Sequence, residues 1–225
     1  SDSAEDQGNL DYLRDTATQA GIDARPIDIA DIGWDGNLFR DLDERAITVL
    51  FKLYPWEWLI REAFGANLLR RTLRVVEPAW KMLLSNKAIL PVLWEMFPGH
   101  PNLLPAHFEP GKFATDFVKK PLYSREGANV TITTGGRTIE EPGEYGEEGF
   151  IWQGYHELPR FGDNYTVIGS WIVGEEPAGI GMREDSTPIT KIASTPQAAK
   201  TFARLTAPSV PSTFSAAVRP SMTVE

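Results

Sequence analysis

The chain has 225 residues, which is enough for one large domain or two small ones with a hydrophobic core. Its apolar content of 42% excludes a disordered chain, and its net charge of −9 argues against a nucleic-acid-binding surface, which needs clustered cations. The sequence contains no cysteine, which excludes disulfides, thiolate metal sites and cysteine nucleophiles.

Targeting and membrane signals do not stand out in the sequence. The first residues, SDSAED, are acidic and polar, unlike a secretory signal. No segment approaches the ~18 consecutive apolar residues that a membrane span needs. We therefore expect a cytoplasmic protein with neither a membrane nor a nucleic acid as its partner.

Residues 1–75 alternate helical and extended signals. Apolar residues recur at helical spacing at Leu10, Leu13 and Ala17. The glycine that follows, Gly21, is a typical helix stop. The isoleucines of residues 27–32 then predict an extended stretch. Residues 46–54 (AITVLFKLY) predict a buried strand, and Pro55 opens a predicted helix over 56–69. This alternation predicts a layered sheet with helices packed on it.

Residues 76–190 begin with helical patterns, in which Asn86 is a candidate cap between two segments. From Phe117 onward, short apolar runs are separated by turns rich in glycine, which predicts an antiparallel β region. Gly179 and Gly181 indicate strand packing or a bulge rather than a dinucleotide-binding turn, because no helix signal follows them.

Residues 191–225 differ in charge and composition from the rest of the chain. They carry four cations and one anion, and Ala, Ser, Thr and Pro dominate them without a strong period. We predict a poorly ordered tail with at most one helical turn near 197–205.

Two segments carry lysines in positions suited to phosphate binding. Residues 77–87 (EPAWKMLLSNK) end at Lys87, and residues 118–129 (VKKPLYSREGAN) contain Lys120 and turn at Gly127. Ammonium groups supply point charges for phosphate oxygens, and a glycine turn lets backbone N–H groups approach them closely. This pattern by itself is not specific, because acidic proteins often have lysines near glycines.

Longer motifs narrow the interpretation. The chain contains, in this order, EPAWKMLLSNKAILPVLWEMFPGHPNLLPA, KKPLYSREGANV, YGEEGFIWQ and VIGSWIVGEEPAGIGMREDSTPIT. Together with the upstream LFKLYPWEWLIREAFG, they resemble the glutathionylspermidine synthase family, and more closely its bacterial members that have only the synthetase part. The resemblance covers about residues 1–190. It implies an ATP-grasp fold and a ligase that joins a carboxylate to an amine through an acyl phosphate, using ATP and magnesium.

The resemblance also implies roles for individual residues around the phosphates. Lys87 and Lys120 would be the two phosphate-binding lysines, converging from separate lobes. A flexible loop over the phosphates would consist of Ser124, Arg125, Glu126 and Gly127. Such a set suits acyl phosphate formation, whose barrier falls mainly through positioning and charge neutralisation.

Further carried-over residues concern the base and the reacting group. The adenine cleft would be lined by Ile151, Trp152 and Gln153. Backbone N–H and C=O groups there would form hydrogen bonds with the edge of the base. Arg183, in GMRED, would be the catalytic arginine near the reacting phosphate, where a fixed cation stabilises developing charge.

Two family motifs have no counterpart here. An Arg-x-Asp and a Glu-Tyr-Asn-Ala-Asp motif supply the family's magnesium carboxylates and the arginine that handles the acyl phosphate. The resemblance therefore implies that this chain lacks the family's first portion and its magnesium ligands. The three histidines lack metal-ligand spacing, so no metal site is expected within the chain. After Thr190 the chain also departs from the family pattern, and our working hypothesis is a frameshifted end.

Lys52 interrupts an apolar strand, which is unusual for a charged residue. It could extend its ammonium group to solvent, pair with Glu57, or face a substrate carboxylate. The 54–57 turn resembles a family segment near the substrate pocket, so Lys52, Trp56 and Glu57 are candidate substrate contacts. Helical spacing nevertheless favours core positions for the tryptophans Trp56, Trp58, Trp80 and Trp94.

We predict an α/β (α+β) chain that is ATP-grasp-like, with a helical entry segment, an antiparallel β lid and part of a second α/β lobe. Residues 1–75 would be a partial lobe of the pre-ATP-grasp synthetase half, 76–190 the ATP-grasp nucleotide-binding region, and 191–225 the divergent tail. The expected function is the ATP-binding part of an ATP-dependent carbon–nitrogen ligase whose substrates are a small acid and an amine, similar to glutathione and a polyamine. The alternative is a catalytically inactive remnant that binds a nucleotide or a partner.

Overall fold

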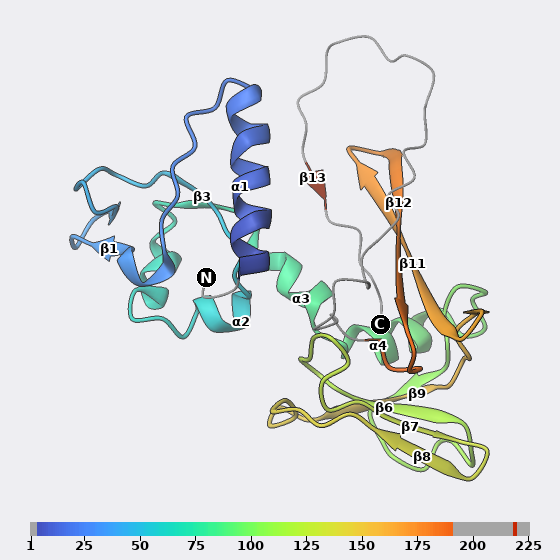
Figure 1. Cartoon of the computed structure of the whole chain (residues 1–225). Helices are drawn as coiled ribbons and strands as arrows, with labels where there is room; N and C mark the ends of the chain where they lie inside the picture. The colour runs from blue at the N-terminus through green and yellow to red at the C-terminus, as the bar shows by residue number, and fades with distance from the viewer. Residues whose placement is uncertain (1–3, 191–217, 220–225) are drawn as a thin grey trace. The chain divides into compact units, whose positions relative to one another are not determined.

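The computed structural model describes residues 4–190 and the backbone of residues 218–219. The chain divides into two compact units, Ser1–Leu83 and Leu84–Glu225. The first unit has one hydrophobic cluster and the second has two. Figure 1 shows the helices and strands of both units. The mixture of helices and largely antiparallel sheets confirms the predicted mixed α/β class.

The first unit combines short helical segments with two small sheets. Its helices and 3-10 turns are α1 (Ala4–Gln19), η1 (Ile29–Asp31), α2 (Trp56–Leu59), η2 (Gly65–Arg70) and η3 (Ala79–Lys81). One sheet pairs antiparallel strands, β1 (Gly33–Trp34) and β2 (Phe39–Arg40). The other pairs parallel strands, β3 (Val49–Phe51) and β4 (Arg74–Val76).

The predicted first helix is confirmed, and its stop lies where the glycine indicated. Gly21 has a φ of 78°, and Ile22 N donates a hydrogen bond of 2.9 Å to Ala17 O. This left-handed residue closes the last turn in the way that glycine allows at helix ends.

Two predictions for this unit are wrong in extent. The helix over 56–69 breaks after α2, because the chain folds back so tightly that a Cβ at Gly65 would lie 2.6 Å from Ile60 O. The strand over 46–54 shrinks to β3, in which Val49 is 56% and Phe51 47% exposed. The apolar run therefore indicated a strand correctly, but only Leu50 of its three residues is buried, so one side of the strand is exposed.

The core of the first unit joins its separate segments. Seven buried side chains form it: Ile32, Phe39, Leu50, Trp56, Leu59, Phe64 and Leu73. Phe39 lies edge-on to Trp34 at 4.8 Å between ring centroids and to Phe64 at 6.0 Å. The segment around β1 is thereby held against the start of η2.

The second unit contains helix α4 (Ile89–Met96) and a five-stranded antiparallel sheet in the order β5-β9-β6-β7-β8. The short helix α3 (Met82–Ser85) spans the division between the units. Asn86 precedes α4 without being its N-cap, which is Ala88, and the Asn86 Oδ1 accepts a hydrogen bond of 2.8 Å from Ala88 N in the turn before the helix. The strands are β5 (Ala106–His107), β6 (Phe117–Pro121), β7 (Thr131–Thr134), β8 (Arg137–Glu140) and β9 (Phe150–Gly154).

A second antiparallel sheet follows along the chain. Its strands are β10 (Arg160–Phe161), β11 (Asn164–Val173), β12 (Glu176–Asp185) and β13 (Val218–Arg219), with β10 and β13 each pairing with β11. The register shifts between Trp171 and Ile172, opposite Gly179, which confirms the predicted bulge. The predictions for the tail concern residues that lie largely outside those described.

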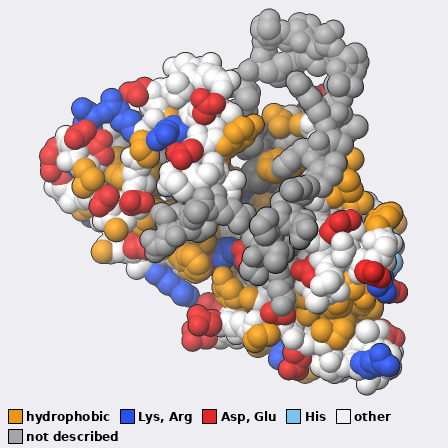
Figure 2. Space-filling view, viewed as in Figure 1, with side chains coloured by type: hydrophobic (Ala, Val, Ile, Leu, Met, Phe, Trp, Pro, Cys, Tyr) orange, Lys and Arg blue, Asp and Glu red, His pale blue; other side chains and the backbone are white. Residues whose placement is uncertain are grey.

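The surface keeps many apolar side chains, which Figure 2 shows in orange among charged groups. Trp56 is 6% exposed, as predicted, but Trp58 is 41% and Trp80 58% exposed, so the core prediction is wrong for these two. Helix α2 is a single turn, and only one of its sides reaches the core. Of the helices that the described residues form, none combines the length and apolar run that crossing a bilayer needs.

Candidate functional site

The five-stranded sheet places the predicted phosphate lysine of β6 on a defined face. Directly opposite residues in antiparallel strands share a face, and successive residues alternate between faces. The register joins Lys120 to Ile151, and Val118 to both Ile132 and Gln153. These five side chains therefore lie on one face, whereas the neighbouring Lys119 points to the other.

Helix α4 brings the second predicted lysine to the end of β6. Leu90 of this helix belongs to a buried cluster with Ala106 and Ile151, while Lys87 N donates a hydrogen bond of 2.9 Å to Leu122 O. The Lys87 ammonium group donates to Ser124 O at 2.7 Å and to Ser124 Oγ at 3.1 Å. Lys87 is thus fixed to the turn that the sequence predicted as the phosphate loop.

Lys120 is held from within the sheet. Its Nζ donates a hydrogen bond of 3.0 Å to Oε1 of Gln153, which is only 5% exposed. Both lysines belong to the unit Leu84–Glu225, so the expectation of separate lobes is wrong. Within this unit, Leu90 of α4 packs with Ala106 and Ile151 of the sheet that carries Lys120.

The Ser124–Gly127 turn is tight and is covered from one side. Glu126 has a φ of 58° and Gly127 has a φ of 71°. Ala128 N donates a hydrogen bond of 3.0 Å to Arg125 O. A Cβ at Gly127 would overlap Cγ2 of Ile189, which is 6% exposed. The turn therefore needs glycine at this position, both for its backbone conformation and for the space that it occupies.

Strand β9 separates the three residues predicted for an adenine cleft. Ile151 and Gln153 face the Lys120 side, and Trp152 lies on the other face, opposite Lys119 and His107. Trp152 and Gln153 have strand neighbours on both sides, whereas Ile151 is paired on the β6 side only. Ile151 is fully buried and Gln153 is 5% exposed, so neither side chain presents a free surface to a ligand beside Lys120.

Arg183 lies on the second sheet. It sits in β12 opposite Val167 and is half-buried, a few residues before Ile189, which contacts the Gly127 turn. The chain thus runs from the predicted catalytic arginine directly to the residue that packs against the predicted phosphate loop.

The three weaker substrate candidates cluster in the first unit. Lys52, Trp56 and Glu57 are 8%, 6% and 7% exposed. The Lys52 ammonium group donates a hydrogen bond of 3.0 Å to Tyr54 O. It also lies 3.4 Å from Oε1 of Glu77, with which it forms an ion pair, and 4.9 Å from the centroid of the Trp56 ring. Glu77 is an ion-pair partner that the sequence did not suggest, because β4 brings it beside β3 from a distant part of the chain.

Metal binding has no support in the residues that the structure describes. Among residues 4–190 no three His, Asp or Glu side chains come together in a group that could hold a metal ion.

Sequence reasoning missed the residues that support the turn. Ile189 and the 7% exposed Thr190 are buried beside Gly127, and Ile189 also packs with Val118 and Val130. The one available signal was an isolated apolar residue after a polar run, which is too weak to predict such a contact.

Comparison with known proteins identifies the family. The sequence model described as "Glutathionylspermidine synthase preATP-grasp" matches residues 1–197 of this chain. That range includes the whole first unit and, in the second unit, both lysines, the turn and Arg183.

Several curated proteins are similar to this chain. A candidate acid–amine ligase of Haemophilus influenzae is 44% identical over 198 residues, covering 83% of this chain and 50% of that protein. A trypanothione synthetase of Crithidia fasciculata is 39% identical over 122 residues, 52% of this chain and 19% of that protein. A bifunctional glutathionylspermidine synthetase/amidase of Escherichia coli is 27% identical over 217 residues, 83% of this chain and 35% of that protein. The chain thus spans about half the length of the first relative and less of the other two. By the extent of the family match, the chain belongs to the glutathionylspermidine synthase family.

Proposed function

We propose that this chain provides the nucleotide-phosphate-binding part of an ATP-dependent ligase that joins a carboxylate to an amine. The observation that supports it most is that Lys87 and Lys120 lie in the same unit. Lys120 is on the α4 side of β6, and Lys87 forms hydrogen bonds with the turn just beyond that strand. Bound ATP would supply a phosphoryl group for transfer to the substrate carboxylate, which creates an acyl phosphate.

The residues of this chain would act by holding charge. Lys87 and Lys120 would neutralise phosphate oxygens, and the hydrogen bonds to Ser124 and Gln153 limit the motion of both ammonium groups before a ligand arrives. Gly127 gives the turn its left-handed backbone and leaves room for Ile189, and the backbone N–H groups of the turn would bind the phosphates. Arg183 would offset charge that develops during transfer.

The substrates are proposed as a class only. The relatives are named for an acid–amine ligase, trypanothione synthetase and glutathionylspermidine synthetase/amidase activities. We propose a small carboxylic acid and an amine for this chain, resembling glutathione and a polyamine. The buried Lys52, Trp56 and Glu57 are candidate contacts for them.

Nucleotide binding can be tested by thermal unfolding with and without millimolar ATP. A ligand that binds only the native state raises the melting temperature. We expect Lys87→Met and Lys120→Met each to reduce the shift strongly and together to abolish it. Lys119→Met is the matched control, because this neighbouring lysine lies on the opposite face, 4.0 Å from the Phe150 ring centroid. Equal losses in all three variants, or no shift in the unmodified chain, would refute the proposal.

A non-catalytic role is the second candidate function. It is favoured by the lack of an acidic metal-binding group among residues 4–190. In that case ATP would raise the melting temperature, but adding acids and amines would release no ADP and form no amide. Amide formation coupled to ADP release would establish the ligase instead.

A further inference from the structure

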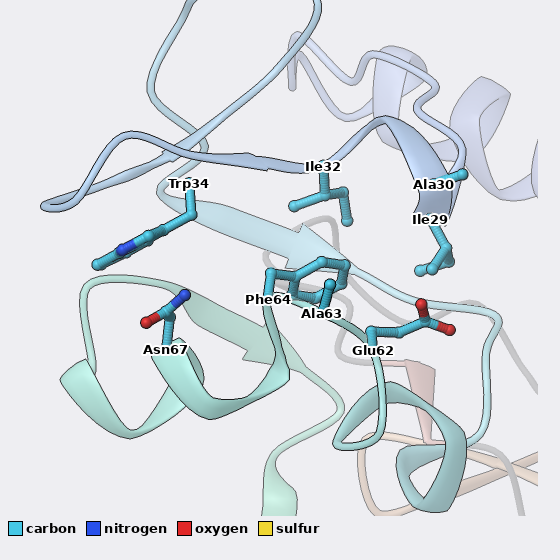
Figure 3. Close-up of a pocket in the computed structure, with 8 residues that line it drawn as sticks. All are labelled: Ile29, Ala30, Ile32, Trp34, Glu62, Ala63, Phe64 and Asn67. Atoms are coloured by element: carbon cyan, nitrogen blue, oxygen red, sulfur yellow. The ribbon is translucent and has the colours of Figure 1, made fainter.

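The first unit contains a cavity that the proposed nucleotide chemistry does not use. Its volume is about 330 Å³, and two segments line it, one from η1 to β1 and one from Glu62 to Asn67 (Figure 3). The lining residues are Ile29, Ala30, Ile32, Trp34, Glu62, Ala63, Phe64 and Asn67. This volume lies at the lower end of the range for small-molecule sites.

Two residues of the cavity wall belong to the core of the unit. Ile32 is 6% and Phe64 7% exposed, and both belong to the main buried cluster of the unit. The wall containing Phe64 is anchored by Gly65, whose backbone approaches Ile60 so closely that a side chain would not fit. A ligand would find this slot formed in advance, which reduces the entropy lost on binding.

The two ends of the cavity are polar and differ in charge. Figure 3 shows the Glu62 carboxylate at the end near Ile29 and Ala30, and the Asn67 amide at the other end with Trp34. Ile32 and Phe64 lie between these ends. The lining contains one acidic residue and neither Lys nor Arg.

The carboxylate is oriented by a neighbouring phenol. Tyr54 Oη donates a hydrogen bond of 2.6 Å to Oε1 of Glu62, which raises the pKa of Tyr54 to about 12. Tyr54 therefore stays neutral and keeps donating at physiological pH. Within residues 4–190, the second carboxylate oxygen, Oε2, has no hydrogen-bond donor that would compete with a ligand.

We infer that this cavity binds a small organic cation, with an ammonium group paired to Glu62, an apolar body between Ile32 and Phe64, and a polar group at Asn67. A carboxylate beside apolar walls attracts a cation more strongly than it would in water, because less solvent screens the pair. An anion would be repelled, and a neutral ligand would leave the carboxylate without a charged partner. The inference does not depend on the proposed nucleotide site.

Tyramine is a suitable probe, because it has an ammonium group, an aromatic body and a hydroxyl at the far end. Tyrosol has the same skeleton with a hydroxyl in place of the ammonium group. Calorimetric titration of the full chain should show that tyramine binds at least about tenfold more tightly than tyrosol, since charge-assisted hydrogen bonds are stronger than neutral ones. Amide chemical shifts should change within 29–34 and 62–67.

Variants separate charge from shape. Glu62→Gln should reduce tyramine affinity at least about tenfold and remove the preference over tyrosol. Ala63→Phe should block both ligands by filling the cavity. Tyr54→Phe removes the hydrogen bond that orients the carboxylate but keeps its charge, so it should weaken tyramine binding less than Glu62→Gln does and retain the preference over tyrosol. Asp43→Asn removes an exposed charge of the same unit and is the control for net charge.

Three outcomes would overturn the inference. They are equal affinity of tyramine and tyrosol, unchanged tyramine binding in Glu62→Gln, and no binding of tyramine at millimolar concentration. The melting-temperature shift caused by ATP is measured on the same samples. Its presence or absence reports separately on the proposed function, because the lysines of that site lie in the other unit.

Discussion

Gly127 carries two constraints that can be separated by substitution. Its φ is 71°, and an added Cβ would overlap Ile189, whereas Gly135 has a φ of 55° with nothing within 4 Å of an added Cβ. Left-handed backbone costs a non-glycine residue roughly 1–2 kcal/mol, and overpacking adds roughly 1–3 kcal/mol. Gly135→Ala should therefore destabilise the second unit by about 1–2 kcal/mol and Gly127→Ala by about 2–5 kcal/mol in urea unfolding. Equal losses would show that Ile189 does not restrict the turn.

Asp35 provides a residue-level prediction for acid stability. Its pKa is lowered from 3.8 to about 2, first by the hydrogen bond from Leu38 N and then by those from Arg40 and Asn37 N. Because the folded state favours the charged carboxylate, this contribution is fully present above about pH 4 and is lost as the pH falls towards about 2. The difference in urea midpoint between the unmodified chain and Asp35→Asn should shrink over that range. A difference that does not vary with pH would contradict this origin of the stability.

At the scale of elements, the segment after β12 packs against the turn after β6. Ile189→Ala removes a buried side chain beside Gly127. Ile132→Ala is the matched control, because Ile132 belongs to the same cluster and its side chain is 4% exposed. Each should cost about 2–5 kcal/mol of stability. If our nucleotide assignment holds, Ile189→Ala should weaken ATP binding at least about fivefold in calorimetric titration. Ile132→Ala should weaken it less than about twofold, because Ile189 supports the turn and Ile132 does not. Equal effects on affinity would mean that Ile189 acts through general stability alone.

The elements also show how far sequence patterns reach. Helix α1 and the strands after Phe117 depend on local signals, so the sequence predicts them correctly. Asn86 lies between two helical segments as predicted, but the N-cap of α4 is Ala88. The break after α2 depends on a backbone contact at Gly65 that no period encodes. The pairing of Lys52 with Glu77 likewise follows from a parallel strand pair, which local patterns cannot predict.

For the candidate site, sequence motifs indicated the residues but not their arrangement. The lysine motifs selected Lys87 and Lys120, and the register shows that Trp152 points away from Lys120. Alternation along β6 would have separated Lys119 from Lys120, but it could not show which face α4 covers. The support from Ile189 depends on a contact between residues distant in the chain.

At the scale of the whole molecule, the two units divide the chemistry between them. The cavity around Glu62 lies in the first unit, and Lys87, Lys120 and the Gly127 turn lie in the second. The main buried clusters are likewise separate, one in the first unit and two in the second. Ligands of the two sites should therefore stabilise different parts of the chain.

Hydrogen exchange of the full chain tests this division directly. At a hundredfold excess over its dissociation constant, a ligand stabilises the native state by about 2.7 kcal/mol, which slows exchange wherever opening of the native structure abolishes binding. ATP should slow exchange within 120–127 and 151–153 and leave 29–34 and 62–67 unchanged. Tyramine should do the reverse. Protection of both sets of residues by either ligand would mean that the two units open together, and the sites would then be energetically coupled rather than independent.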